Sequence, residues 1–450
     1  MDIFLETALR AHPEREAVVS SSGTLTYDAL YRDVMHMRDA LKAQGKGRVL
    51  LYGRKSPEML EAMLACLLAG RTYIPADENI PSQRLEAIIE QAEPSLCITD
   101  LPFPYDIPHA SVLALDTLAP VQDEPSEDAY ILFTSGSTGI PKGVVITREN
   151  LASFIRWVSA LPALRKEHTH VLNQASFAFD LSVGDIFYAL CNGHTLHLLT
   201  SGYPDFYPFL KDIEVMFITP AFMKLLLSDP SFRQENFPRL SVIFFCGEQL
   251  LPSLVKKIRS RFGCTILNAY GPTEACCAVC ASEISADMTE RDLLPCGDLD
   301  TAAVGIEIEA DEIILKGNSV GKGYLHGRTF DHVFATGDIG EIINSRLYCH
   351  GRKDRQIKYK GFRIELDEIE EVLLQTEKVQ DCAVAASRNA DGTVTRLHAY
   401  LVSSAESSDI LACLQNKLPA YMIPILHFVD EIPRNDNQKT DRKALYEKDS

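Results

Sequence analysis

The chain lacks the features that mark membrane proteins, secreted proteins and nucleic-acid-binding proteins. Its apolar runs are shorter than a membrane-spanning helix requires, and residues 1–6 lack the basic stretch and apolar core of a secretory leader. Positive charge is scarce, with 44 Lys and Arg against 62 Asp and Glu and a net charge of -18. Because a phosphate backbone is bound by a basic surface, we expect no nucleic-acid partner and no membrane insertion. The expected compartment is the cytoplasm.

Metal-ligand spacing is also missing, although the sequence has 12 cysteines. In a chain expected in the cytoplasm these are predicted to be reduced thiols, many of them buried as small apolar side chains. Cys276, Cys277 and Cys280 form the one cluster, and no second Cys or His pair at ligand spacing lies nearby in the sequence. A metal site at this cluster is therefore the less favoured interpretation.

The length and the pattern of apolar residues predict a two-domain α/β protein. A chain of 450 residues exceeds one hydrophobic core. Segments with helical and strand-like patterns alternate, which predicts mostly parallel sheets covered by helices. The predicted helices are 58–68, 221–227 and 253–262, and the predicted strands are 71–75, 129–133, 215–218, 242–246 and 264–268.

The character of the sequence changes near the charged run at 351–356. The residues after it resemble a small α+β domain, with a helix at 366–374 and strands at 379–385 and 397–402. The predicted domains are therefore 1–353 and 354–450.

The run at 132–143, Leu-Phe-Thr-Ser-Gly-Ser-Thr-Gly-Ile-Pro-Lys-Gly, is the most informative segment. Glycines let successive N–H groups face one anion, hydroxyls add donors, and Lys142 adds a mobile positive charge. The common P-loop needs glycine directly before the lysine, where this chain has Pro141. We interpret the run as a cradle for nucleotide phosphates rather than a flexible surface loop. Its expected binding residues are Thr134, Ser135, Gly136, Ser137, Thr138, Gly139 and Lys142.

Three segments follow directly after predicted strands. They are the cradle after Phe133, Gly247 after the strand at 242–246, and residues 269–271 after the strand at 264–268. Ligand sites in parallel α/β sheets lie beyond the carboxyl ends of the strands. These segments are therefore candidates for the functional site.

Motifs at 68–77, 132–143, 179–183, 268–274, 335–338, 351–365 and 433–443 occur in this order along almost the whole chain. Together they resemble the adenylate-forming superfamily of acyl-CoA ligases, luciferases and the amino-acid adenylation domains of nonribosomal peptide synthetases. Within it the chain is most similar to the D-alanine–carrier protein ligases, on the motifs at 179–185 and 244–248. It departs from them at Gly184, where methionine is expected, in the compressed segment 286–325, and at Gln438, where glycine is expected.

The resemblance implies the adenylate-forming enzyme fold, in which a large N-terminal domain binds ATP and the amino acid. A small mobile C-terminal domain would carry the catalytic lysine. With ATP and Mg²⁺, a carboxylate would attack the α-phosphorus and expel pyrophosphate, and a thiol would then attack the acyl adenylate and release AMP. Nothing after Lys443 resembles a carrier domain. The expected acceptor is therefore the phosphopantetheine thiol of a separate acyl or peptidyl carrier protein.

The resemblance also implies roles for single residues. Lys439, Thr273 and Glu274 form the expected catalytic set: Lys439 would bring carboxylate and α-phosphate together, Thr273 would touch the phosphate, and Glu274 would hold the metal, Mg²⁺. Asp354 is the expected hinge. The nucleotide-binding set adds to Lys439, Thr273 and the cradle the residues Asn268, Ala269, Tyr270 against adenine, Gly271, Asp338 on the ribose hydroxyls, and Arg352.

Asp180 decides the substrate class. A partly buried carboxylate needs a cationic partner, and in the family this position binds the substrate's α-ammonium. The alternative is that Asp180 caps a helix beginning at Leu181. The expected pocket wall is apolar, which predicts a small neutral amino acid, with D-alanine first and serine, cysteine or a modest aliphatic residue still open. This wall consists of Leu181, Gly184, Phe217, Phe244, Cys246, Ala269, Cys277 and Ala278.

Two other functions stay open at this point. The first is a carboxylic acid–CoA ligase of the same fold, and the second is a non-catalytic nucleotide-binding regulator. The joint presence of Lys439, Glu274 and Asp180 argues against the regulator. Teichoic acid D-alanylation and peptide natural-product assembly are both compatible with the sequence.

Overall fold

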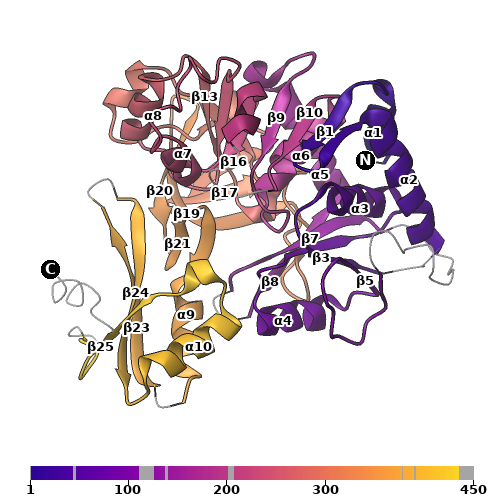
Figure 1. Cartoon of the computed structure of the whole chain (residues 1–450). Helices are drawn as coiled ribbons and strands as arrows, with labels where there is room; N and C mark the ends of the chain where they lie inside the picture. Colours follow the sequence, from indigo (N-terminus) through magenta and orange to yellow (C-terminus); the bar gives the residue numbers. More distant parts are fainter. Residues whose placement is uncertain are drawn as a thin grey trace. The chain divides into compact units, whose positions relative to one another are not determined.

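The computed structural model describes residues 2–43, 47–110, 126–136, 140–200, 207–377, 379–389 and 392–434. The chain divides into two compact units. The first contains Met1–Glu78, Ala92–Leu132 and Gly143–Gly351, and the second contains Asn79–Gln91, Phe133–Lys142 and Arg352–Ser450. Figure 1 follows the chain through its elements. The predicted domains 1–353 and 354–450 stay a prediction.

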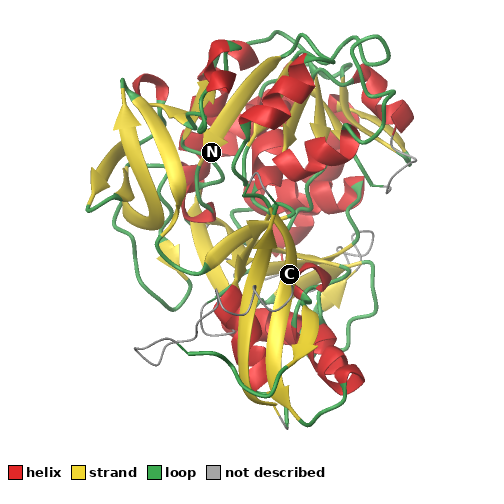
Figure 2. Ribbon diagram, turned by 90° about the vertical axis from the view of Figure 1, so that its left-hand side faces the viewer, coloured by secondary structure: helices red, strands yellow, loops and turns green. Residues whose placement is uncertain are grey.

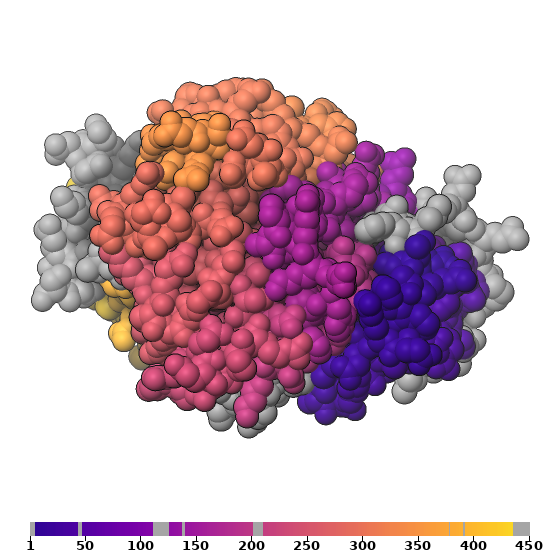
Figure 3. All heavy atoms as spheres, turned by 90° about the horizontal axis from the view of Figure 1, so that it is seen from above, coloured from indigo at the N-terminus to yellow at the C-terminus, as the bar shows by residue number. Residues whose placement is uncertain are grey.

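An eight-stranded sheet has the order β14-β13-β12-β11-β9-β10-β1-β2. The strands from β13 to β1 pair in parallel, whereas β14 and β2 pair antiparallel at the two edges. Figure 3 shows the indigo N-terminal segment against magenta atoms from the middle of the chain, as the pairing of β1 with β10 requires. The strands are β1 (Glu16–Ser20), β2 (Gly23–Thr26), β9 (His170–Asn173), β10 (Thr195–Leu198), β11 (Val215–Ile218), β12 (Val242–Phe245), β13 (Thr265–Tyr270) and β14 (Cys280–Glu283).

A seven-stranded sheet has the order β18-β8-β7-β4-β3-β5-β6, and a five-stranded antiparallel sheet has the order β15-β20-β19-β17-β16. The first consists of β3 (Val49–Gly53), β4 (Tyr73–Asp77), β5 (Leu96–Thr99), β6 (His109–Ala110), β7 (Asp128–Thr134), β8 (Lys142–Thr147) and β18 (Gly323–Tyr324). The second consists of β15 (Gly297–Asp298), β16 (Gly305–Glu309), β17 (Glu312–Lys316), β19 (Val333–Ile343) and β20 (Arg346–Arg352).

Helices pack on the faces of these sheets (Figure 2). In α3 every residue from Met59 to Leu68 is buried, and α6 is buried along its whole length, as is typical of helices with apolar residues on all sides. Both belong to one apolar core together with residues of the two larger sheets. The helices of the first unit are α1 (Asp2–Ala11), α2 (Tyr27–Ala43), α3 (Pro57–Leu68), α5 (Arg148–Ala160), α6 (Leu181–Cys191), α7 (Pro220–Leu226) and α8 (Pro252–Arg259).

The second unit has its own apolar core. A hairpin precedes a helix, and a three-stranded sheet follows in the order β23-β24-β25. Its elements are α4 (Ser82–Ala92), β21 (Gln356–Tyr359), β22 (Phe362–Glu365), α9 (Leu366–Leu374), β23 (Val379–Arg388), β24 (Val394–Ser403), α10 (Ser407–Lys417) and β25 (Ile425–Phe428).

The sequence predictions agree with the structure to within a few residues. The strand at 215–218 and the helix at 366–374 have the predicted bounds. The helix predicted at 253–262 is α8, which ends earlier, at Arg259, although Phe262 is buried. Phe262 continues the apolar pattern because it packs against Phe232, with ring centroids 4.8 Å apart. None of the described helices is both long enough and apolar enough to cross a bilayer.

Four histidines gather at the start of β9 and around β10: His168, His170, His194 and His197. His170 Nδ1 lies 2.7 Å from His197 Nε2, and the His194 ring packs against Tyr188 at 4.9 Å between centroids. The residues His194 and His197 are 1% and 4% exposed. Burial, aided by a neighbouring histidine in each case, lowers the pKa of both from 6.5 to about 4. Both imidazoles are therefore neutral in the folded protein near neutral pH.

We expect these histidines to make the protein sensitive to acid. Between pH 6.5 and about 4 the unfolded chain binds protons that the folded chain excludes, so the free energy of unfolding falls as the pH falls. His194→Phe keeps a ring against Tyr188 but binds no proton. It should remove about 2 kcal/mol of the loss between pH 8 and pH 5, measured by urea unfolding. His36→Gln, at an exposed position of α2, should keep the wild-type slope, and an unchanged slope in His194→Phe would contradict the assignment.

Candidate active site

The phosphate cradle begins at the end of β7. Ser135 Oγ donates to the Arg363 carbonyl at 2.7 Å, and Thr134 Oγ1 lies 3.5 Å from the carbonyl of Lys142. A Cβ on Gly136 would lie 2.1 Å from the carbonyl oxygen of Ile140, so the turn requires glycine there. The two described parts of the cradle, which end at Gly136 and resume at Ile140, thus lie close together. Ser137, Thr138 and Gly139 lie outside the described residues.

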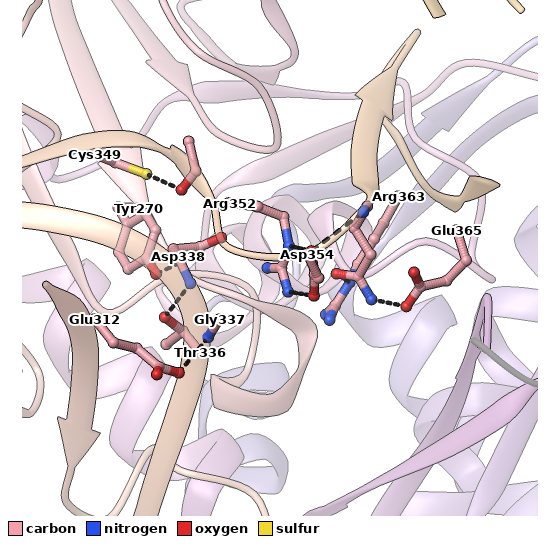
Figure 4. A network of polar contacts seen from close by, with 12 residues as sticks. Tyr270, Glu312, Thr336, Gly337, Asp338, Cys349, Arg352, Asp354, Arg363 and Glu365 are labelled. Carbon is pink, nitrogen blue, oxygen red and sulfur yellow. Dashed lines mark hydrogen bonds and ion pairs between the residues drawn. The ribbon is translucent and has the colours of Figure 1, made fainter. Parts of the chain in front are cut away.

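The expected adenine and ribose residues meet directly. Tyr270, at the end of β13, donates its hydroxyl to Asp338 Oδ2 at 2.6 Å (Figure 4). Burial, reinforced by the charge of Asp338, raises the pKa of Tyr270, so the phenol stays a donor. Residues 68 positions apart in the sequence therefore form one group.

Asp338 lies in β19, at an irregular point of the strand. Its backbone N–H donates to Thr336 Oγ1 at 3.0 Å, and the N–H of Gly337 donates to Glu312 Oε1 at 2.7 Å. Gly337 has a φ of 75°, a conformation that favours glycine. The motif Thr336-Gly337-Asp338 thus forms a local turn that fixes the orientation of the carboxylate.

The other predicted residues of β13 have structural contacts. Asn268 Nδ2 donates to the Pro295 carbonyl at 2.8 Å, and Ala269 is buried within the strand. A Cβ on Gly271 would lie 2.4 Å from Ala278 Cα and 2.8 Å from the Cys277 carbonyl oxygen. Glycine at 271 therefore lets the segment at 277–278 pass close to the end of β13.

The expected phosphate residue contacts the expected ammonium residue. Thr273, in a short 3₁₀ turn (Thr273–Ala275), donates its hydroxyl to Asp180 Oδ2 at 2.5 Å. Asp180 occupies the position before α6, but its carboxylate forms no capping bond to the described residues of that helix. The alternative role of Asp180 as a helix cap is therefore wrong, because the carboxylate turns toward Thr273.

Glu274 is 1% exposed and accepts a hydrogen bond from the Tyr324 hydroxyl at 2.6 Å. Sequence reasoning missed Tyr324, which lies in β18 and belongs to none of the motifs considered. Among the described residues no group of three or more His, Cys, Asp or Glu side chains could hold a metal ion. The cysteines at 276, 277 and 280 are buried thiols.

The predicted pocket wall forms one buried cluster. A Cβ on Gly184 would lie 3.2 Å from Phe217 Cδ1 and 3.8 Å from Cys277 Sγ. The Phe217 and Phe244 rings lie 4.7 Å apart, and Cys246 Sγ donates to the Cys277 carbonyl at 3.5 Å. The same core contains Leu181, Phe217, Phe244, Cys246, Ala269, Cys277 and Ala278.

Arg352 and Asp354, in the second unit, form a two-pronged ion pair. Arg352 donates through Nε and a terminal nitrogen to the two carboxylate oxygens of Asp354, both at 2.7 Å. Burial alone would raise the pKa of Asp354, but the bonds and charge of Arg352, together with Arg363, lower it. The roles of Arg352 at the ribose and Asp354 as a hinge stay predictions. Lys439 lies outside the described residues.

The chain matches both family models and single known proteins. Residues 5–325 match the family model described as AMP-binding enzyme, and residues 368–439 match the AMP-binding enzyme C-terminal domain. The D-alanine--D-alanyl carrier protein ligase of Listeria welshimeri is 35% identical over 92% of this chain and 93% of that protein. The ligase of the same name from Staphylococcus aureus is 32% identical over 98% of each chain.

Solved structures show the same fold at lower identity. The adenylation domain AlmE of Vibrio cholerae, in complex with glycyl-adenosine-5'-phosphate, has a TM-score of 0.86 and 23% identity, over 99% of this chain and 96% of that one. The o-succinylbenzoate CoA synthetase MenE of Bacillus subtilis has a TM-score of 0.85 and 21% identity, over 99% and 98%. The predicted α/β architecture is confirmed.

The close approach at Gly271 gives a test of the site's packing. Gly271→Ala should lower the free energy of unfolding by about 1–3 kcal/mol, because the clash is with backbone atoms that cannot rotate away. Gly263→Ala is the matched control, since no described atom lies within 4 Å of a Cβ there. Urea unfolding of the two variants measures the difference. Equal stability of both variants would contradict the tight packing at 271.

Proposed function

The chain belongs to the AMP-binding enzyme family, and we propose that it is an ATP-dependent, AMP-forming ligase for a small neutral amino acid, D-alanine first. It would form the aminoacyl adenylate and transfer the aminoacyl group to the phosphopantetheine thiol of a separate carrier protein. The name shared by the Listeria and Staphylococcus relatives supports this substrate and this kind of acceptor.

The contact between Thr273 and Asp180 is the observation that carries the proposal. The ammonium and carboxylate groups of an α-amino acid are attached to the same carbon. A residue that binds the ammonium must therefore lie close to a residue that touches the phosphorus under attack. The 2.5 Å hydrogen bond gives Asp180 and Thr273 that relation.

In the first step the substrate carboxylate attacks the α-phosphorus of ATP, and the bond to pyrophosphate breaks. Asp180 would hold the ammonium, and Thr273 would turn its single hydroxyl proton from Asp180 to the phosphate once the substrate is bound. Lys439 would place its ammonium between carboxylate and α-phosphate, where negative charge gathers in the transition state. The proposal assigns positioning and charge neutralisation to these residues, which is what phosphoryl-type transfer mainly requires.

Nucleotide binding is assigned to two groups. Asp338 would accept ribose hydroxyls, since Tyr270 holds its Oδ2 and leaves the carboxylate in one orientation. Glu274 suits Mg²⁺, because this ion takes oxygen ligands and is usually held by one or two carboxylates together with phosphates. When bound, Mg²⁺ would neutralise charge on the phosphate oxygens.

The side chain of the substrate is assigned to the buried cluster around Phe217. This cluster consists of apolar side chains and thiols, so a charged substrate side chain would be buried without a partner. The rings of Phe217 and Phe244 occupy volume that a larger substrate would need. A methyl group is therefore the substrate side chain that this small apolar cluster suits best.

In the second step the carrier thiol attacks the carbonyl carbon of the adenylate, the bond to the phosphate oxygen breaks, and AMP leaves. A hinge at Asp354 would let the C-terminal part present Lys439 first and the segment 358–363 second. A carboxylic acid–CoA ligase would share the fold and the first step, but it would have no use for a carboxylate at position 180.

Pyrophosphate exchange tests the function. We expect exchange with D-alanine above that with L-alanine, serine or fatty acids. Lys439→Ala should lower the exchange rate by roughly two to three decades, because a transition-state charge partner is removed. Lys443→Ala, in the same segment, should keep the wild-type rate. Exchange with fatty acids alone would overturn the substrate class.

Magnesium binding has a separate test. Glu274→Gln keeps an oxygen for the Tyr324 hydroxyl but removes the charge that would hold the ion. We expect the Mg²⁺ concentration for half-maximal exchange to rise by about tenfold, in line with the loss of one charged ligand. Glu283→Gln, at an exposed position of β14, is the control. An unchanged Mg²⁺ dependence in Glu274→Gln would remove Glu274 from the metal site.

A further inference from the structure

A half-buried lysine holds the segment that leads to Asp180. Lys55 follows β3, and its Nζ donates to three consecutive backbone carbonyls, those of Asn173 at 3.0 Å, Gln174 at 3.1 Å and Ala175 at 2.9 Å. An ammonium has three donors and no acceptor, which matches three converging carbonyls. Lys55 thus fixes the backbone directly after β9.

The carboxylate of Asp77 holds the next residue of the same segment, Ser176. Ser176 Oγ lies 2.7 and 2.6 Å from the two carboxylate oxygens of Asp77, at the end of β4. The hydroxyl oxygen also accepts the N–H of Ala178 at 3.0 Å. Since Lys55 and Asp77 come from neighbouring parallel strands, one sheet edge anchors residues 173–176.

Hydrogen bonds connect the anchored segment to the start of α6. Phe179 N–H donates to the Ser176 carbonyl at 3.0 Å, and Ser182 Oγ donates to the Phe179 carbonyl at 2.8 Å. On the other side, Asn173 Nδ2 donates to Asp185 Oδ1 at 2.6 Å, and both residues are 0% exposed. Asp180 therefore lies between two fixed points.

Burial shifts the pKa values of Lys55 and of the two carboxylates near it. Burial lowers the pKa of Lys55 to about 7, against the opposing attraction of Asp185 and Asp77. Burial likewise raises the pKa of Asp77 and of Asp185. An apolar side chain at 55 would avoid these costs but would leave three carbonyls without their donor.

We propose that Lys55 and Asp77 are positioning residues, which fix the Asp180 carboxylate for the substrate ammonium and so set the preference for an amino acid over the same acid without the amino group. This inference rests on the proposed function. Neither residue would touch the substrate: Lys55 acts on the backbone carbonyls of 173–175, and Asp77 acts on the Ser176 hydroxyl.

The test compares two ligands that differ in the ammonium alone. In pyrophosphate exchange, the KM for D-alanine measures recognition of the whole substrate, and the inhibition constant of propionate measures recognition without the ammonium. In Lys55→Met we expect the KM for D-alanine to rise at least tenfold. The inhibition constant of propionate and the KM for ATP should change by less than twofold. Lys55→Arg, which restores donors, should recover part of the loss.

The matched control is Lys166→Met. Lys166 Nζ donates to Ser241 Oγ at 2.5 Å, away from the segment at 173–180, so this variant should keep all three constants. Ser176→Ala removes the second anchor without changing a charge, and we expect it to raise the KM for D-alanine in the same selective way. If Lys55→Met does not fold, as judged by circular dichroism, Ser176→Ala decides the question.

Two results would overturn the inference. One is a parallel loss for D-alanine and propionate in the variants, which would make the anchors merely structural. The other is no change for either ligand. Absence of exchange with any amino acid in the wild-type protein is a distinct result, because it would remove the proposed function itself.

Discussion

The direction of the parallel strands is the constraint on which the site depends. Because β9, β12 and β13 run the same way, the residues that follow them emerge at one edge of the sheet. Asp180 follows β9, Cys246 follows β12, and Thr273 follows β13. The hydrogen bond between Asp180 and Thr273 and the contact between Cys246 and Cys277 arise at this edge. A change of strand order would separate these residues.

The sequence predicted the elements well because their apolar periodicity is strong, as in the strand at 215–218 and the helix at 366–374. It placed Tyr270 and Asp338 in one site, but their mutual hydrogen bond depends on how two sheets pack. Tyr324 and Lys55 were missed because each acts through one atom on a distant partner, and no local pattern marks them. The roles of the site residues, including Lys439, stay predictions.

Three ionisable side chains whose pKa values are shifted by burial hold the backbone after β9. Lys55, Asp77 and Asp185 lie within the first unit, where each would be unfavourable without partners. Their partners are carbonyls, a hydroxyl and an amide at residues 173–176. Asp338 is held in a comparable way by Tyr270 and by the turn at 336–337. After β9 the charged groups fix the backbone. At Asp338 the neutral donors fix the carboxylate in one orientation.

Glycine at position 184 has a consequence for how substitutions in this core combine. Any residue with a Cβ there meets Phe217 at 3.2 Å, and Phe217 in turn contacts Phe244. A side chain at position 184 therefore requires the Phe217 ring to give way by a few tenths of an ångström, whereas a smaller residue at 217 alone would leave a void. Substitutions at 184 and 217 are therefore expected to be non-additive, because the two positions share one contact.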